Sequence, residues 1–197
     1  SLVALITPFN EDGSVNFDKL GELIDFHLAN STDALVILGT TGESSTMSHE
    51  EDNAVCEYTV KRVAGRIPVI AGSGSNSTQT MLEKSLSYER LGADGLLLIT
   101  PYYNKTNEEG MYLHFKTVAD AVKIPCILYN VPGRTGCSIS VANVARLSQH
   151  PNIVGIKEAS GNMSYAAKVA KYLSDDFAMY SGNDDMIVPL LSICLLY

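Results

Sequence analysis

Basic clusters and cysteine motifs are both missing from this sequence of 197 residues. The 14 Lys and Arg residues are outnumbered by 22 Asp and Glu residues, which gives a net charge of −8, and no basic patch is present that would neutralise nucleic-acid phosphates. The cysteines lie far apart, without a Cys-x-x-Cys spacing or a Cys/His cluster, which argues against a disulfide framework and a zinc site. They are Cys56, Cys126, Cys137 and Cys194. We therefore expect small-molecule partners, no nucleic acid, no metal and a reducing compartment.

Long hydrophobic runs are missing as well. The longest apolar stretches have the length of a strand or a short helix, well below the ~20 residues that a membrane span needs. The first residues lack the basic start, apolar core and small-residue cleavage site of a signal peptide. The sequence therefore predicts a soluble, cytoplasmic protein that is not bound to a membrane.

What the sequence does have is a regular succession of short runs rich in Val, Ile and Leu. The runs occupy residues 2–6, 34–38, 67–71, 95–99, 125–129, 153–157 and 177–181. Neighbouring runs begin roughly 30 residues apart, the size of one strand-plus-helix unit, and their continuous apolarity is typical of parallel strands buried on both faces. Residues 18–29 and 163–173 show helical spacing, and helix-start signals stand at Ser48 with Glu51, at Ser77 and at Asn107. We predict an α/β fold of about seven βα units.

Two architectures accommodate such a repeat, a doubly wound open sheet and a (β/α)8 barrel. An open sheet ordinarily carries a glycine-rich phosphate fingerprint after its first strand, whereas "TPFNEDG" stands there and "GSGSNS" (72–77) is only a partial match. Polar residues instead follow nearly every apolar run, as at the catalytic face of a barrel. No eighth strand is visible. We therefore predict one incomplete domain over residues 1–197, a (β/α)8 TIM barrel truncated after about seven strands.

Lys157 ends the apolar run of "IVGIKEASG" (153–161), and its ammonium group has two alternative roles. Either the methylenes cover the core while the charge stays in water, or the amine points into the barrel mouth, where desolvation lowers its pKa and lets it form a Schiff base. Tyr129 closes the preceding run and is a candidate proton relay, since strand ends of a parallel barrel converge. Hydroxyl partners for it are Thr40, Thr41, Tyr102 and Tyr103. Arg134 lies in a Pro-Gly turn and suits a substrate carboxylate.

Four motifs together resemble the dihydrodipicolinate synthase family, within the pyruvate-dependent class I aldolases. They are "GTTGES" (39–44), "TPYYN" (100–104), "YNVPGRTG" (129–136) and "GIKEASG" (155–161). The resemblance implies a (β/α)8 barrel that assembles as a homotetramer and condenses pyruvate with L-aspartate 4-semialdehyde, on the way to diaminopimelate and lysine. It implies no metal or organic cofactor, because the lysine itself is the electron sink.

The same resemblance assigns roles to single residues. Lys157 is expected to form the imine with pyruvate, and Tyr129 to transfer protons through the Thr40 hydroxyl and Tyr103, which reaches in from a neighbouring subunit. Further substrate contacts are implied for Thr41 at the pyruvate carboxylate, Arg134 at the semialdehyde carboxylate and Gly182 near the imine.

The chain departs from the family pattern in two places. Many relatives are inhibited by lysine at a site that Ser44, Ser45, His49, Asn76 and Tyr102 fit. Asp52 and Thr80 stand where inhibited members carry a histidine and a glutamate, which argues against feedback inhibition. Second, "ICLLY" (193–197) replaces the glycine-rich stretch before strand eight, and the C-terminal helical domain is absent. An inactive truncated barrel is therefore one alternative. The other is a related pyruvate aldolase that shares the lysine and the tyrosine, such as N-acetylneuraminate lyase or a sugar-acid aldolase.

Overall fold

The computed structural model describes residues 1–193, so Cys194 and the rest of the "ICLLY" stretch after Ile193 lie outside the described residues. The chain divides into two compact units. The first consists of Ser1–Ser73 and Glu83–Leu97, and the second of Gly74–Leu82 and the residues from Leu98 onward. Helix α3 (Thr78–Leu91) and strand β4 (Gly95–Ile99) each continue from one unit into the other.

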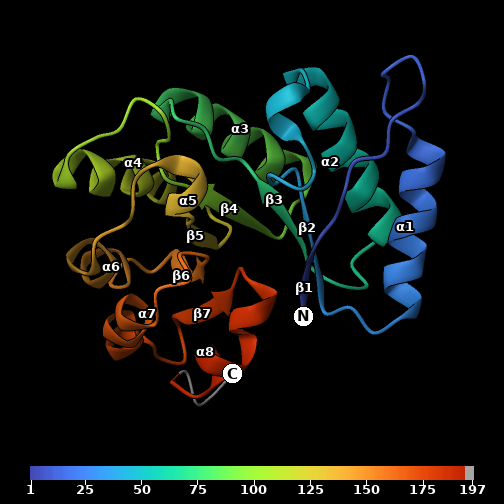
Figure 1. Cartoon of the computed structure of the whole chain (residues 1–197). Coiled ribbons are helices and arrows are strands. Elements are labelled where there is room, and N and C mark those ends of the chain that lie inside the picture. Colours follow the sequence, from blue (N-terminus) through green and yellow to red (C-terminus); the bar gives the residue numbers. More distant parts are fainter. Residues whose placement is uncertain (194–197) are drawn as a thin grey trace. The chain divides into compact units, whose positions relative to one another are not determined.

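Strands of the first unit pair in parallel and in chain order. β1 (Leu2–Ala4) pairs with β2 (Ala34–Ile37), β2 with β3 (Val69–Gly72), and β3 with the start of β4. Every residue of β2 and β3 is buried, which explains why these strands are apolar without alternation. Helices α1 (Phe17–Ala29) and α2 (His49–Val63) follow β1 and β2 and lie side by side (Figure 1).

Strands of the second unit are parallel too. β5 (Cys126–Asn130) pairs with β6 (Ile153–Glu158), which pairs with β7 (Ala178–Ser181). The helices of this unit are α4 (Glu108–Ala121), α5 (Pro132–Thr135), α6 (Val141–Leu147), α7 (Met163–Val169) and α8 (Ile187–Leu191). Short 3-10 turns lie in both units: η1 (Ser44–Thr46) in the first, and η2 (Ala170–Tyr172) and η3 (Asp184–Met186) in the second.

A bulge interrupts the pairing of β5 with β6 near its start. Cys126 is opposite Ile153, but Ile127 is opposite Gly155, so Val154 is an extra residue in β6. From there the pairing is regular, and it ends with Tyr129 opposite Lys157 and Asn130 opposite Glu158. The position of Lys157 relative to β5 therefore depends on one inserted residue.

All seven predicted strands are present, with ends that shift by at most two residues. The predicted helix starts are confirmed as well. Ser48 and Glu51 form a capping box, the Asn107 side chain accepts a hydrogen bond from Gly110 N–H, and Ser77 Oγ accepts one from Thr80 N–H. The helix predicted over 163–173 ends earlier, at Val169, because its last turn tightens into η2. Within residues 1–193, no helix is both long and apolar enough to cross a bilayer.

Candidate active site

The side chains of Lys157 and Tyr129 lie together at the carboxyl ends of β6 and β5. The two residues are directly opposite each other in the parallel pairing, so their side chains leave the sheet on the same face. Lys157 Nζ lies 4.7 Å from the centre of the Tyr129 ring, within the range of a cation–π contact. The strand ends thus bring an amine and a phenol to one place.

Burial shifts the pKa of both groups. Desolvation lowers the pKa of the Lys157 ammonium below its ordinary value of 10.5, because a half-buried cation loses hydration that no carboxylate replaces. None of the ion pairs within residues 1–193 involves Lys157. Burial raises the pKa of the Tyr129 phenol, and the positive charge of Arg134 offsets part of that rise. The lysine is therefore easier to deprotonate, while the phenol keeps its proton at neutral pH.

Gly182, the residue after β7, forms a wall next to the lysine. A methyl group at this position would lie 3.2 Å from Lys157 Cε and 2.6 Å from Ala159 Cβ. Its N–H donates a 2.7 Å hydrogen bond to the Glu158 carbonyl. The close approach of this backbone to the lysine stem therefore requires glycine.

Arg134 lies on α5, a one-turn helix directly after β5. Pro132 occupies the start of this helix and Gly136, with φ +69°, ends it, as expected from the backbone preferences of the two residues. The Thr135 hydroxyl lies 2.8 Å from the Cys137 carbonyl oxygen, to which it donates, and 3.2 Å from the Val131 carbonyl oxygen, and it stiffens the turn. The Arg134 side chain is exposed and belongs to no ion pair of the described chain. Its guanidinium is thus available to an anionic ligand.

Thr40 and Thr41 lie in the first unit, in the loop that follows β2. Leu38 enters this loop with φ +58°, and its backbone passes so close to Gly72 that a methyl group there would lie 2.4 Å from the Leu38 carbonyl oxygen. The loop is fixed further by the buried Thr7 hydroxyl, which donates to the Gly42 carbonyl at 2.7 Å. Both threonines are exposed on this fixed loop, and their link to Tyr129 stays a prediction.

Tyr103 follows β4 and points away from the core. Its side chain is 90% exposed and its backbone is left-handed, with φ +68°, an uncommon state for a bulky residue. Tyr102 is half-buried, and its carbonyl accepts a hydrogen bond from Asn104 N–H at 2.8 Å. Such exposure agrees with a tyrosine that acts outside its own chain, which remains a prediction.

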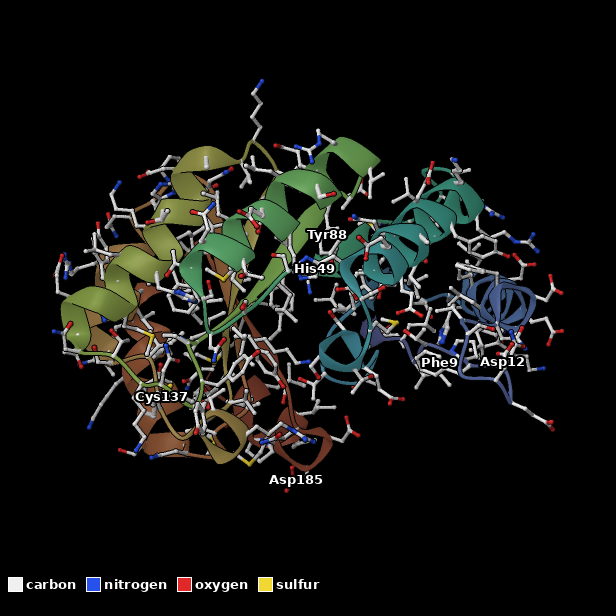
Figure 2. The ribbon with its side chains drawn as sticks, turned by 90° about the horizontal axis from the view of Figure 1, so that it is seen from above. Phe9, Asp12, His49, Tyr88, Cys137 and Asp185 are labelled. Atoms are coloured by element: carbon white, nitrogen blue, oxygen red, sulfur yellow. The ribbon has the colours of Figure 1, made fainter. Side chains whose placement is uncertain are left out.

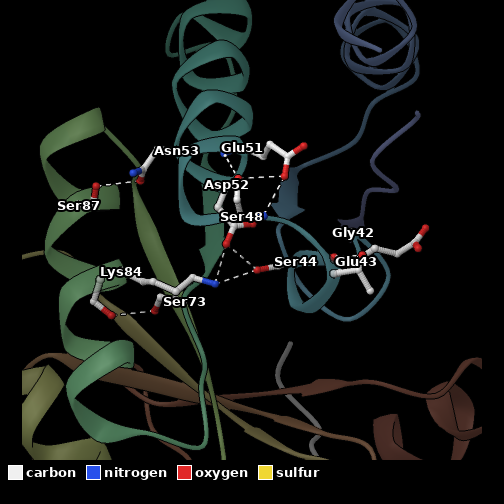
Figure 3. Close-up of polar contacts among 12 residues, drawn as sticks. Gly42, Glu43, Ser44, Ser48, Glu51, Asp52, Asn53, Ser73, Lys84 and Ser87 are labelled. Atoms are coloured by element: carbon white, nitrogen blue, oxygen red, sulfur yellow. Dashed lines mark hydrogen bonds and ion pairs between the residues drawn. The ribbon is translucent and has the colours of Figure 1, made fainter. Parts of the chain in front are cut away.

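Ser44, one of the residues expected at an effector site, belongs to a buried polar cluster of the first unit (Figure 3). Lys84 Nζ lies 2.9 Å from Asp52 Oδ2, with side chains that are 11% and 1% exposed. The Ser44 hydroxyl donates to Asp52 Oδ2 at 3.0 Å and accepts from Lys84 at 2.8 Å. Tyr88, labelled in Figure 2, is fully buried, and the centre of its ring lies 5.9 Å from Lys84 Nζ. Burial and the Asp52 charge raise the pKa of its phenol. The other expected effector residues, Ser45, His49, Asn76 and Tyr102, are half-buried or exposed.

Sequence comparison identifies the family to which this arrangement belongs. A sequence model of the Dihydrodipicolinate synthetase family matches residues 1–195. The chain belongs to this family. It is 55% identical over 193 residues to 4-hydroxy-tetrahydrodipicolinate synthase 1 of Clostridium acetobutylicum, covering 98% of this chain and 66% of that protein. It is 53% identical over 191 residues to the synthase of Acetivibrio thermocellus, covering 97% and 64%. The chain thus spans slightly under two thirds of the relatives' length.

Solved dihydrodipicolinate synthases share the fold. The structure of the Aquifex aeolicus enzyme matches with a TM-score of 0.95 at 47% identity, over 98% of this chain and 66% of that one. The Acinetobacter baumannii enzyme, solved in complex with pyruvate, matches with a TM-score of 0.94 at 44% identity over the same shares. The predicted α/β barrel fold is confirmed, with seven of its strands within residues 1–193.

Sequence reasoning about this dihydrodipicolinate synthase family member missed two sets of residues. Lys84, which joins Asp52 and Ser44, has no motif of its own, because the pairing depends on how two helices pack. Asn130 and Glu158 directly follow Tyr129 and Lys157, and they form a buried contact described below. Their position next to the two candidate catalytic residues was the available signal. No group of three or more His, Cys, Asp or Glu side chains that could hold a metal ion lies within residues 1–193.

Proposed function

We propose that the chain carries the lysine-centred site of a 4-hydroxy-tetrahydrodipicolinate synthase, which condenses pyruvate with L-aspartate 4-semialdehyde. The observation that carries this proposal is the desolvated Lys157 amine, 4.7 Å from the centre of the Tyr129 ring. Membership of the dihydrodipicolinate synthetase family supports the choice of substrates. Because the chain spans about two thirds of its relatives, activity of the whole protein is part of the proposal.

The reaction begins at the free amine. Lys157 Nζ attacks the keto carbon of pyruvate, and the carbinolamine loses water to give an imine. Loss of a methyl proton then gives an enamine, whose carbon adds to the aldehyde of the second substrate. The amino group of that substrate next displaces Lys157 from the imine carbon, which closes the ring and regenerates the lysine. The protonated imine accepts the electron pair, so the scheme uses no metal or organic cofactor.

Each neighbouring residue has a proposed role in these steps. Tyr129, whose raised pKa keeps the phenol protonated, donates a proton to the departing hydroxyl of the carbinolamine and exchanges it through Thr40 and Tyr103. Thr41 binds the pyruvate carboxylate, and Arg134 binds the carboxylate of the semialdehyde. Gly182 leaves room beside the lysine stem.

Assembly and regulation follow from the same proposal. We propose a homotetramer, supported by a Tyr103 side chain that is 90% exposed, and a cytoplasmic location that suits a biosynthetic role. We also propose that lysine does not inhibit the protein, since Lys84 already binds Ser44 and Asp52. Activity assays with added lysine test this last point.

Trapping with borohydride tests the central step. Incubation with pyruvate and sodium borohydride should add one reduced pyruvate to the protein, and peptide mapping should place it on Lys157. A Lys157→Arg variant should give no adduct, because arginine stays protonated. A folded wild-type protein that forms no adduct would contradict the proposal and favour a barrel without catalytic function.

The second substrate separates the synthase from the related aldolases. A sugar-acid aldolase or N-acetylneuraminate lyase would form the same pyruvate imine but accept polyhydroxylated aldehydes. Turnover of L-aspartate 4-semialdehyde, measured against such an aldehyde after imine formation, distinguishes the two. Faster reaction of the sugar aldehyde would overturn the proposed substrate.

A further inference from the structure

A buried amide–carboxylate contact lies directly behind the lysine and the tyrosine. Asn130 and Glu158 are the last residues of β5 and β6, are opposite each other in the pairing, and are 0% and 3% exposed. Asn130 Nδ2 donates a 2.8 Å hydrogen bond to Glu158 Oε2. Since successive side chains of a strand alternate between faces, this contact is on the face opposite to Lys157 and Tyr129.

The remaining oxygen atoms of this contact hold the two loops that follow the strands. Asn130 Oδ1 accepts hydrogen bonds from Ile139 N–H at 3.0 Å and from the Ser138 hydroxyl at 3.1 Å. These residues close the segment that carries Arg134. Glu158 Oε1 accepts from Ser160 N–H at 2.6 Å, in the loop that follows Lys157. One pair of side chains therefore fixes both strand ends and both loops.

The two side chains have fixed and different hydrogen-bonding roles. The Ile139 N–H can only donate, so Asn130 must turn its oxygen toward Ile139 and its NH2 group toward Glu158. Glu158 must accept on both oxygens, from Asn130 and from Ser160. A neutral amide at position 158 would place its NH2 group against either the Asn130 NH2 group or the Ser160 N–H, whichever way it turned. Either arrangement leaves a buried donor without an acceptor, which is costly.

We propose that Asn130 and Glu158 are positioning residues, which hold the ends of β5 and β6 so that the Lys157 amine stays against the Tyr129 ring and out of water. Neither residue touches the reacting atoms. Their relevance to catalysis rests on the proposed imine at Lys157, whereas their effect on the environment of Lys157 does not. This separation allows the two proposals to be tested independently.

The decisive experiment exchanges the two side-chain chemistries. Glu158→Gln alone places two hydrogen-bond donors against each other, and Asn130→Asp alone places two carboxylates against each other. The double variant Asn130→Asp, Glu158→Gln restores every bond: the new amide would donate to the new carboxylate and accept from Ser160, and the new carboxylate would also accept from Ile139 and Ser138. Its net charge equals that of the wild type. Glu109→Gln, which removes an exposed carboxylate paired with Arg146, is the matched control.

The readout is the reactivity of Lys157 itself, measured by competitive acetylation with limiting acetic anhydride across a pH series and quantified by peptide mass spectrometry. In each folded single variant we expect the midpoint of the Lys157 profile to rise toward that of a solvated lysine. The double variant and the Glu109→Gln control should match the wild type. A role in stability alone would lower the unfolding midpoint but leave the Lys157 profile of the folded protein unchanged.

Pyruvate trapping with borohydride on the same four variants tests the link to the proposed function. We expect each single variant to trap about tenfold more slowly, since displacement of a reacting group by ~1 Å is enough for such a loss, and the double variant to recover. Suppose that the Lys157 profile shifts in the single variants and recovers in the double variant, but that no protein traps pyruvate. This result would support the positioning role and contradict the proposed function.

The positioning role is overturned if the folded single variants have the same Lys157 profile as the wild type, whether or not pyruvate is trapped. It is equally overturned if the midpoint of the Lys157 profile is displaced as far in the double variant as in the single variants. Should the single variants fail to fold, the double variant decides the question. It must fold and match the wild-type profile, and failure in either respect refutes the pairing.

Discussion

Burial of His114 makes the stability of this chain depend on pH in a direction that the structure fixes. His114, on α4, is 3% exposed. Its Nδ1 lies 2.8 Å from the Thr78 hydroxyl and its Nε2 lies 3.3 Å from the Ile99 carbonyl oxygen. The neutral ring satisfies both contacts by accepting from Thr78 and donating to Ile99. Burial lowers the pKa of His114 from 6.5 to about 4.

The sign and size of the effect follow from proton linkage. As the pH falls below 6.5, the unfolded chain binds a proton at His114 before the folded chain does, so the free energy of unfolding decreases. The contribution is fully present above pH 6.5 and is lost as the pH falls through about 4. A pKa difference of about 2.5 units at 1.36 kcal/mol each amounts to about 3 kcal/mol, of which about 2.5 kcal/mol is lost by pH 4.5.

Urea unfolding at about pH 7.5 and about pH 4.5 measures this loss. Between the two pH values, the wild type should lose about 2.5 kcal/mol more than a His114→Gln variant, which cannot titrate. His49→Gln, which removes an exposed histidine at the start of α2, should keep the pH dependence of the wild type. Parallel curves for the wild type and His114→Gln would refute the reasoning.

Three further predictions concern the two units. Lys84→Met should reduce the free energy of unfolding, measured in urea, by about 3–5 kcal/mol, because it leaves the buried Asp52 carboxylate without its cation. Lys61→Met, which removes the cation of an exposed pair, should cost less than about 1 kcal/mol. Equal losses in the two variants would contradict this prediction. Gly182→Ala should slow pyruvate trapping about tenfold by crowding the lysine, while Gly133→Ala, where a methyl group meets nothing within 4 Å, should leave it unchanged. Arg134→Ala should raise the KM for L-aspartate 4-semialdehyde about tenfold or more, the loss of a charge-assisted bond, without slowing pyruvate trapping, and an unchanged KM would remove its assigned role.

The order and type of the strands could be predicted from the sequence because the strands are buried on both faces. A run such as "ALVIL" (34–38) is apolar at every position, and all four residues of β2 are buried. The ends were less certain. The run 2–6 predicts a strand of five residues, whereas β1 ends at Ala4, and Ile6 is 51% exposed. Local composition does not show where a strand leaves its neighbour.

The candidate site was predictable to the extent that it depends on strand order. Tyr129 and Lys157 end consecutive parallel strands, so topology predicts that they lie at the same edge of the sheet, whereas the face that they share depends on the register of β5 against β6. The contact of Lys84 with Asp52 was not predictable, because it depends on how the helices α2 and α3 pack. The contact of Asn130 with Glu158 depends on the register of β5 against β6, which the amino-acid sequence alone does not specify.

The bulge at Val154 has a consequence for protein design. If the same residues were paired regularly from Cys126 and Ile153 onward, with Val154 opposite Ile127, Ile156 would be opposite Tyr129 and Lys157 would be opposite Asn130. The amine and the phenol would then emerge on opposite sides of the sheet. Grafting the two strand sequences onto an ideal, regular strand pair would therefore keep the residue types but separate the amine from the phenol. A designer who copies this chemistry must also copy an irregularity at the far end of the strand, three residues before the lysine.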